Sequence, residues 1–132
     1  MTNAAGRPIQ VIKTDKAGPP VGPYSQGIKA AGFVFVAGEK GLDPVTGKIV
    51  PGGIEAETRQ MLDNVGRLLR AAGLDYGDVV KATVYLRDFS EFETMNRVYR
   101  EYFASEPPTR ATVGVTALAR DFRVEIEVIA AR

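Results

Sequence analysis

The sequence predicts an α+β fold, in which a single mixed sheet of about six strands carries two helices on one face in the order β-β-β-α-β-α-β-β. Three observations predict it. Short segments rich in β-branched and aromatic residues alternate with two segments of helical periodicity. The chain has 132 residues, the length of one ordinary domain, and its 45% apolar and 25% charged residues match globular averages. No apolar run approaches the ~18 residues of a membrane-spanning helix.

We expect one domain over residues 1–132, with residues 1–8 as a flexible N-terminal arm. Residues 1–10 lack the apolar stretch of a secretory signal, so we expect a cytoplasmic protein that does not associate with membranes. The formal net charge is only +1 and no block of like charge occurs, so nucleic acid is not an expected partner.

The first part of the chain consists of strands and turns. Residues 15–23 contain three prolines and two glycines and predict an irregular loop that ends at Tyr24. Residues 26–31 and 33–37 flank Gly32 and predict two short strands joined by a tight turn. Residues 43–47 predict a further turn, with Pro at its second position and Gly at its last.

Two amphipathic helices follow. Apolar residues recur at steps of three and four from Ile54 to Ala72, and Gly73 stands where a helix would end. Ser90 and Glu93 have the spacing of a capping box, which predicts the start of a second helix. Its apolar positions run from Phe92 to Phe103, before two consecutive prolines.

Residues 79–87, 109–115 and 123–130 predict the remaining strands, because apolar and polar side chains alternate in them. Two helices cannot cover both sides of a sheet of about six strands. We therefore expect copies of the chain to cover the second face in a homo-oligomer.

The residue types that the chain lacks exclude several reaction classes. There is no Cys and no His, so disulfides, thiolate nucleophiles, Ser-His-Asp triads and imidazole or thiolate metal sites are impossible. Carboxylate, Lys, Tyr, Ser/Thr and Arg chemistry remains. No clustered acidic pattern indicates a magnesium site, and we expect neither a metal nor a cofactor.

Several residues can carry chemistry, although each also has a purely structural interpretation. Arg110 opens a strand and is either an ordinary surface arginine or a fork that grips a carboxylate. Glu125 and Glu127 project from one face, about 7 Å apart, as solvated side chains or as carboxylates that position or deprotonate a water. Tyr24 lies in a stiff loop as a packing anchor or a functional phenol. Gly38 follows an apolar strand and permits close backbone approach.

Taken together, segments that follow one another along nearly the whole chain after Gly22 resemble the RidA/YjgF family. They are residues 22–27 (GPYSQG), 62–65 (LDNV), 71–73 (AAG), 80–88 (VKATVYLRD), 95–99 (MNRVY), 108–113 (PTRATV) and 124–130 (VEIEVIA). The resemblance implies a chorismate-mutase-like subunit and a homotrimer with ligand clefts between neighbouring subunits. It also implies a cofactor-free reaction in which water adds to an imine or enamine carboxylate, such as 2-iminopropionate formed from 2-aminoacrylate. The products are a 2-keto acid and ammonia.

The resemblance also implies roles for individual residues. Arg110 matches the arginine that binds the substrate carboxylate, and Glu125 matches the glutamate that positions the attacking water. Tyr24, Asn96 and the Gly38 backbone match other cleft positions, with Tyr24 expected to take part in catalysis. Thr112 stands among the substrate-binding positions where many members have Cys, and residues 37–39 read Ala-Gly-Glu where many have Ser-Gly-Gln.

Two alternatives stay open. Ala37 and Glu39 favour a ligand-binding or chaperone-like protein that keeps the cleft but has little turnover, whereas Arg110, Glu125 and Tyr24 favour an enzyme. The second alternative is RNA cleavage or translation inhibition. The near-neutral charge and the lack of His, the usual general base for RNA cleavage, argue against it.

Overall fold

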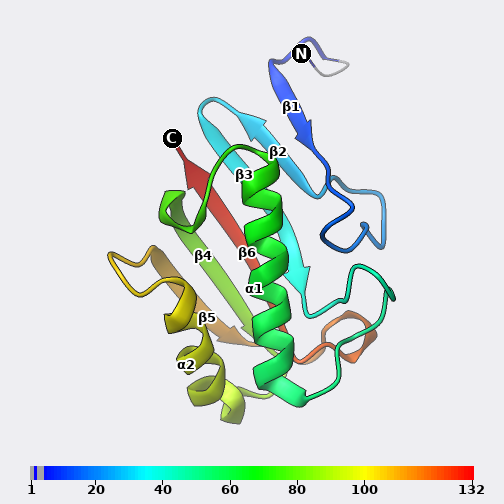
Figure 1. Ribbon diagram of the computed structural model, residues 1–132, viewed down its shortest axis with the longest axis vertical. Coiled ribbons are helices and arrows are strands. Elements are labelled where there is room, and N and C mark those ends of the chain that lie inside the picture. Colours follow the sequence, from blue (N-terminus) through cyan, green and yellow to red (C-terminus); the bar gives the residue numbers. More distant parts are fainter. Residues whose placement is uncertain (1, 3–4) are drawn as a thin grey trace.

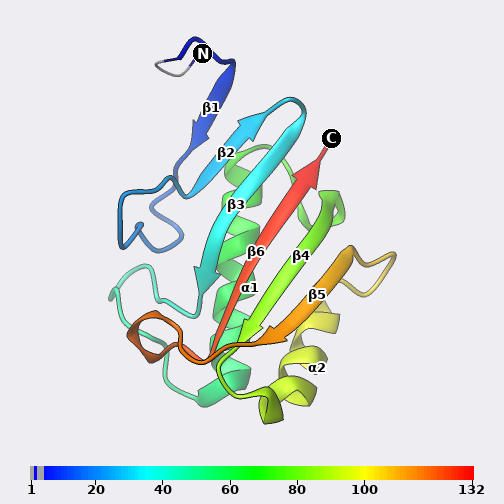
Figure 2. The ribbon, with the colours of Figure 1, turned by 180° about the vertical axis from the view of Figure 1, so that it is seen from behind.

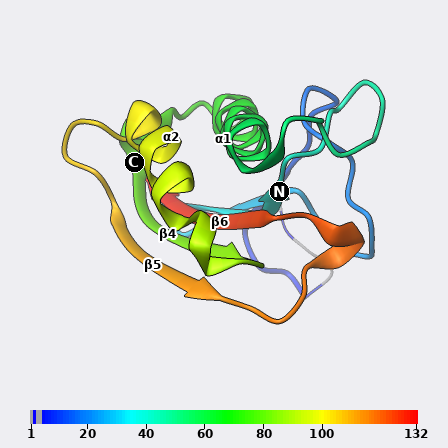
Figure 3. The same ribbon diagram turned by 90° about the horizontal axis from the view of Figure 1, so that it is seen from below.

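The computed structural model describes residue 2 and residues 5–132, and it shows two helices packed on one face of a six-stranded sheet (Figures 1 and 3). The strands lie in the order β1-β2-β3-β6-β4-β5, and only the β4–β5 pair is parallel. The predicted fold class is confirmed. The elements are β1 (Ile9–Ile12), β2 (Gly27–Ala30), β3 (Phe33–Lys40), α1 (Gly53–Ala71), η1 (Tyr76–Asp78), β4 (Val79–Leu86), η2 (Phe89–Glu91), α2 (Phe92–Tyr102), β5 (Thr109–Gly114), η3 (Ala119–Asp121) and β6 (Val124–Ala131).

The predicted order has three strands before the first helix, and β1 is the one whose residues the sequence did not indicate. It is only four residues long and pairs antiparallel with β2 at the edge of the sheet. Of the expected N-terminal arm, residues 1, 3 and 4 lie outside the described residues, and Thr2 forms an isolated bridge with Pro8. The sheet therefore begins directly after the segment predicted to be an arm.

Local backbone geometry explains where the main elements begin and end. Ala31 and Gly32 both have positive φ, 52° and 81°, which is the two-residue hairpin turn that suits the twist of β2 and β3. Gly73, with φ 79°, follows the last turn of α1, and the Leu74 N–H donates to the Leu69 carbonyl at 2.8 Å. Both turns agree with the sequence prediction.

The predicted capping box at Ser90 and Glu93 is wrong. Ser90 lies inside η2, where its N–H and its hydroxyl both donate to Asp88 Oδ1, at 3.0 and 2.7 Å. The N-cap of α2 is Glu91, without a side-chain cap. The Asp88 carboxylate, two residues upstream, accepts both hydrogen bonds in a local turn, so the Ser90 side chain does not cap α2.

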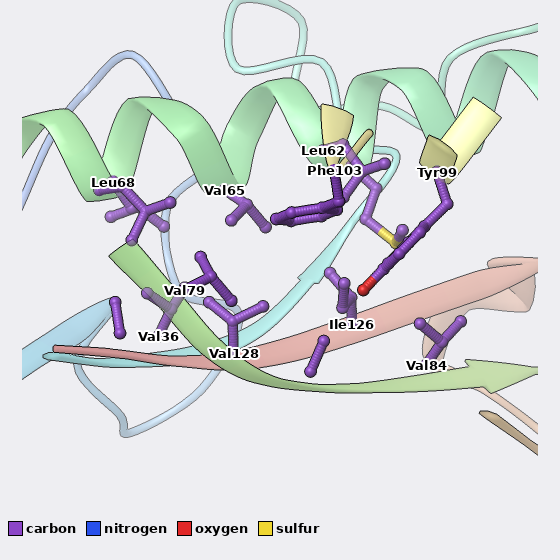
Figure 4. Packing of buried hydrophobic residues seen from close by; sticks show 14 of the residues in the cluster. Val36, Leu62, Val65, Leu68, Val79, Val84, Tyr99, Phe103, Ile126 and Val128 are labelled. Carbon is purple, nitrogen blue, oxygen red and sulfur yellow. The ribbon is translucent and has the colours of Figure 1, made fainter. Parts of the chain in front are cut away.

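The core lies between the sheet and the helices (Figure 4). Leu62, Val65 and Leu68 from α1 meet Val128 and Ile126 from β6. The opposite face of the sheet carries no helix (Figures 2 and 3). Large apolar side chains of that face, among them Phe33, Phe35 and Val113, are 40–44% exposed. In the described part of the chain, no helix is long and apolar enough to cross a membrane.

Candidate functional site

The residues expected to form a site fall into two groups on different faces of the sheet. Glu125 alternates with the buried Val124 and Ile126 and therefore projects to the face without helices. Arg110 is opposite the buried Ala82 in the β4–β5 register and projects toward α2. The structure does not bring Glu125 and Arg110 together within one chain, since β4 and the thickness of the sheet separate them.

A bulge in β3 builds the first group. Val34 and Val36 face the helices, and unbroken alternation would place residue 38 on that side as well. The register instead shifts between Val36 and Glu39, so that Glu39 becomes the buried residue. Gly38 lies so close to Glu125 that a Cβ on it would collide with the carboxylate. The bulge therefore makes room for Glu125 beside the backbone of β3.

Burial raises the pKa of Glu125, the neighbouring Lys40 charge lowers it, and Glu127 raises it further, with burial the strongest effect. Lys40 is opposite Glu125 in the register, and its Nζ donates to the Gly38 carbonyl at 2.8 Å. Glu127 is exposed and accepts a hydrogen bond from the Tyr85 hydroxyl at 2.7 Å. Glu125 is therefore a half-buried carboxylate with a raised pKa, which can accept a proton as a general base.

Tyr24 borders the same region from the loop before β2. The residue is 40% exposed, its hydroxyl accepts a hydrogen bond from Val21 N–H at 3.2 Å, and Lys40 Nζ lies 5.9 Å from the ring centroid. A depression of about 840 Å³ opens between Tyr24 and the segment around Thr14. Lys40 thus lies against the Tyr24 ring and donates to the Gly38 carbonyl, and its charge acts on Glu125.

The second group is built around Arg110. Its guanidinium carbon lies 4.6 Å from the centroid of the Tyr99 ring and 5.7 Å from that of Phe92. Arg110 Nη1 donates to Asn96 Oδ1 at 2.8 Å. No ion pair within the described part of the chain involves Arg110. The guanidinium is therefore held by two rings and an amide, with its charge uncompensated.

Among the described residues, two hydroxyls near this arginine are buried without a hydrogen-bond partner. They belong to Thr112, two residues along β5 on the same side as Arg110, and to Tyr99. A pocket of about 370 Å³ lies beside Arg110, between α2 and residues 107–108. Buried hydroxyls normally have partners, so Thr112 and Tyr99 mark places where a bound molecule or water can supply one.

Among the described residues, no three acidic side chains gather into a group that could bind a metal ion. The expectation of a cofactor-free reaction rests on the sequence and on the chemistry that the side chains of Glu125, Tyr24 and Arg110 can carry out.

Comparison with known proteins gives the family. The sequence profile of the endoribonuclease L-PSP family matches residues 14–132. A RutC family protein of Pyrococcus horikoshii is 50% identical over 92% of this chain and 96% of that protein. A 2-iminobutanoate/2-iminopropanoate deaminase of Bos taurus is 47% identical over 92% of this chain and 88% of that protein.

Solved structures agree. RidA from an Antarctic Psychrobacter superimposes with a TM-score of 0.90 at 39% identity, covering 93% of this chain and 99% of that one. E. coli TdcF with bound serine gives a TM-score of 0.89 at 39% identity, with 93% and 98% covered. The chain belongs to the RidA/YjgF family.

In this RidA/YjgF chain the matched positions are divided between the two groups. Tyr24, Gly38 and Glu125 lie in the first, and Arg110, Asn96 and Thr112 in the second. Neither group holds both an uncompensated arginine and a glutamate that is free to act as a base.

Sequence reasoning missed two residues of this RidA/YjgF site. The apolar positions from Phe92 to Phe103 indicated only a helix, but Tyr99 and Phe92 also hold Arg110. The spacing from Asn96 to Tyr99, three residues on a helix, places an amide and a ring on one side and could have indicated them.

Proposed function

We propose that this chain hydrolyses reactive 2-imino and 2-enamino acids, such as 2-iminopropionate, to 2-keto acids and ammonia. The observation that carries the proposal is the state of Arg110, a guanidinium fixed on Tyr99 and Asn96 without an acidic partner among the described residues. Such a group fits a ligand carboxylate, which can accept two parallel hydrogen bonds from it. The deaminase name of the Bos taurus relative supports this reading.

Glu125 supplies the base that the reaction needs. An imine carbon is already electrophilic, so a bound water attacks it once a carboxylate removes a proton from the water. The carboxyl group returns this proton to the nitrogen, which gives a carbinolamine. The carbinolamine hydroxyl then loses its proton to the carboxylate, which passes it to the amino group, and the carbon–nitrogen bond breaks to release ammonia as the carbonyl forms. Arg110 holds the substrate carboxylate throughout, while Tyr24 and the Gly38 backbone border the water side. Positioning of this kind makes the addition of water, a bimolecular step in solution, effectively unimolecular.

The two groups of residues become one site if they come from different chains. We therefore propose that the chain forms a homotrimer, with Arg110 of one subunit facing Glu125 of the next. The exposed Phe33, Phe35 and Val113 support association through the open face, because such apolar surface is stabilised by burial. Light scattering at micromolar concentration tests it: three chains per particle are expected, and a stable monomer would rule out the shared site.

RNA cleavage is the alternative that the description of the matched family favours. The net charge of +1 and the absence of His give this chain neither a basic surface for phosphates nor the usual base for the 2′-hydroxyl. A site with one uncompensated arginine and one carboxylate is better suited to a small carboxylate with a reactive carbon.

The direct test is the loss of freshly generated imines of several amino acids, measured against their spontaneous hydrolysis. We expect the purified protein to accelerate the loss, with ammonia and the 2-keto acid formed in equal amounts. Binding of the keto acid without acceleration would instead identify a ligand-binding protein. Cleavage of a labelled RNA without any imine turnover would identify the nuclease alternative.

A further inference from the structure

Arg100 is a second arginine on the pocket beside Arg110, and the proposed reaction does not use it. It lies on α2, four residues after Asn96, whose side-chain oxygen accepts the hydrogen bond from Arg110 at 2.8 Å. Residues four apart on a helix lie on one face, about 6 Å apart along the axis. Both arginines line the pocket of about 370 Å³, Arg100 from α2 and Arg110 from β5.

Within the described part of the chain, no acidic side chain forms an ion pair with Arg100. The positions three and four residues before it on α2 hold Arg97 and Asn96, and the helix ends two residues after it. The adjacent Glu101 is paired with Arg59 at 2.7 Å. Glu106 lies in the exposed segment before the two prolines and does not line the pocket. The charge of Arg100, like that of Arg110, is therefore left for a ligand.

The other walls of the pocket are mostly apolar, and its volume is large for the substrate named above. Tyr99, Phe103, Pro107 and Pro108 supply these walls. Ligand pockets of about 300 Å³ or more hold molecules well above the size of 2-iminopropionate, whose side chain is a methyl group. A longer apolar side chain would suit the walls but give Arg100 no partner. A longer side chain that ends in a carboxylate suits both the walls and the charge.

We propose that this pocket selects imino acids whose side chain ends in a carboxylate, with Arg100 binding that second carboxylate while Arg110 binds the first. The proposal rests on the proposed function in taking Arg110 to bind the carboxylate next to the imine carbon. The substrate class is a short-chain 2-imino dicarboxylate, such as the imine of glutamate, which reacts with one water to give 2-oxoglutarate and ammonia. Arg100 determines specificity and takes no part in proton transfer.

The test compares two stable 2-keto acids of equal chain length, 2-oxoglutarate with the second carboxylate and 2-oxopentanoate without it. Their dissociation constants are measured by calorimetry on the full-length protein. In wild type we expect 2-oxoglutarate to bind about three- to tenfold more tightly, because a partly exposed charge pair contributes modestly. In Arg100→Gln this preference should disappear, while 2-oxopentanoate, which has no second charge, should bind about as tightly as before.

Arg97→Gln is the matched control, because Arg97 is an exposed arginine on the same helix that pairs with Glu55. It lowers the net charge by the same amount and should retain the preference for 2-oxoglutarate. Raising the salt concentration to about 1 M should reduce the preference in wild type, since charges are then screened within about 3 Å. An equal preference in wild type and Arg100→Gln would overturn the proposal.

Pyruvate, a stable 2-keto acid with a single carboxylate, distinguishes this proposal from the proposed function. If pyruvate and 2-oxopentanoate bind but 2-oxoglutarate binds no more tightly than 2-oxopentanoate, the specificity is wrong and the proposed function stands. If 2-oxoglutarate binds through Arg100 but no imine is hydrolysed faster than spontaneously, the proposed function is wrong and the second carboxylate site stands. If none of the three keto acids binds, both are overturned.

Discussion

At the scale of single residues, the site depends on charged groups that the fold leaves without full compensation. Arg110 rests on rings in place of an acidic partner, and Glu125 lies half-buried beside a glycine. Both residues were predicted as candidates from the sequence, each beside a structural interpretation that the local pattern fits as well. A strand-opening arginine has the same local pattern whether or not an acidic side chain reaches it, and that is decided by tertiary packing.

The first prediction concerns Arg110. Arg110→Ala should lower kcat/KM by roughly ten- to a hundredfold, because removing one partner of a charge-assisted pair costs on the order of 1.5–3 kcal/mol. Arg110→Lys keeps the charge but loses the planar fork, so its activity should lie between the two. Arg97→Ala is the control, an exposed arginine of α2 that pairs with Glu55. Undiminished pyruvate binding in Arg110→Ala would remove the carboxylate-binding role.

Glu125 should behave differently, because it acts on the water. Glu125→Gln should bind pyruvate nearly as wild type does but lose turnover by about a hundredfold or more. The base must be ionised, and burial raises the pKa of Glu125. As the pH is lowered, wild-type activity should therefore begin to fall at a pH above the ordinary pKa of a glutamate. A pH–rate profile measures this. Wild-type turnover in Glu125→Gln would exclude Glu125 as the base.

Glu39 leads to a prediction about stability. The folded chain holds the Glu39 proton up to about pH 8, whereas the unfolded chain releases it near 4.5. Between these pH values the unfolded state binds fewer protons than the folded state. The contribution of Glu39 to the free energy of unfolding therefore falls as pH rises and is constant above pH 8. Urea unfolding at fixed protein concentration should show wild type losing on the order of 1–3 kcal/mol relative to Glu39→Gln between pH 5 and 8. Parallel changes in both proteins would mean that Glu39 titrates normally.

At the scale of elements, periodicity predicted both helices and five of the six strands to within a few residues. The misses have physical causes. β1 is a short edge strand whose pairing with β2 is a long-range contact, and the bulge in β3 has no signal in local alternation. The bulge matters most, because it places Gly38 beside Glu125 and buries Glu39.

Gly38→Ala tests the bulge. The added Cβ would meet the Glu125 carboxylate, which must then move. A displacement of about 1 Å at a reacting group can cost up to a hundredfold, so turnover should fall on the order of ten- to a hundredfold with little change in melting temperature. Gly77→Ala is the matched control, since nothing lies within 4 Å of its Cβ position. Full activity in Gly38→Ala would show that Glu125 needs no close approach to β3.

At the scale of the whole molecule, the separation of Arg110 from Glu125 is the central feature. One face of the sheet is covered by α1 and α2, the other exposes apolar side chains, and the two halves of the site lie on these different faces. The sequence predicted an uncovered face from the number of helices alone. It could not predict which half of the site each face would carry.

The most direct test of this account mixes two variants that are each strongly impaired. Arg110→Ala and Glu125→Gln are unfolded together in equal amounts, refolded, and assayed for imine turnover. If each site takes Arg110 from one subunit and Glu125 from its neighbour, about a quarter of the sites receive both intact residues by random assembly, so about a quarter of wild-type activity should return. Each variant refolded alone should show only its own low residual activity. No recovery from the mixture, although the variants form mixed oligomers, would contradict a site shared between subunits.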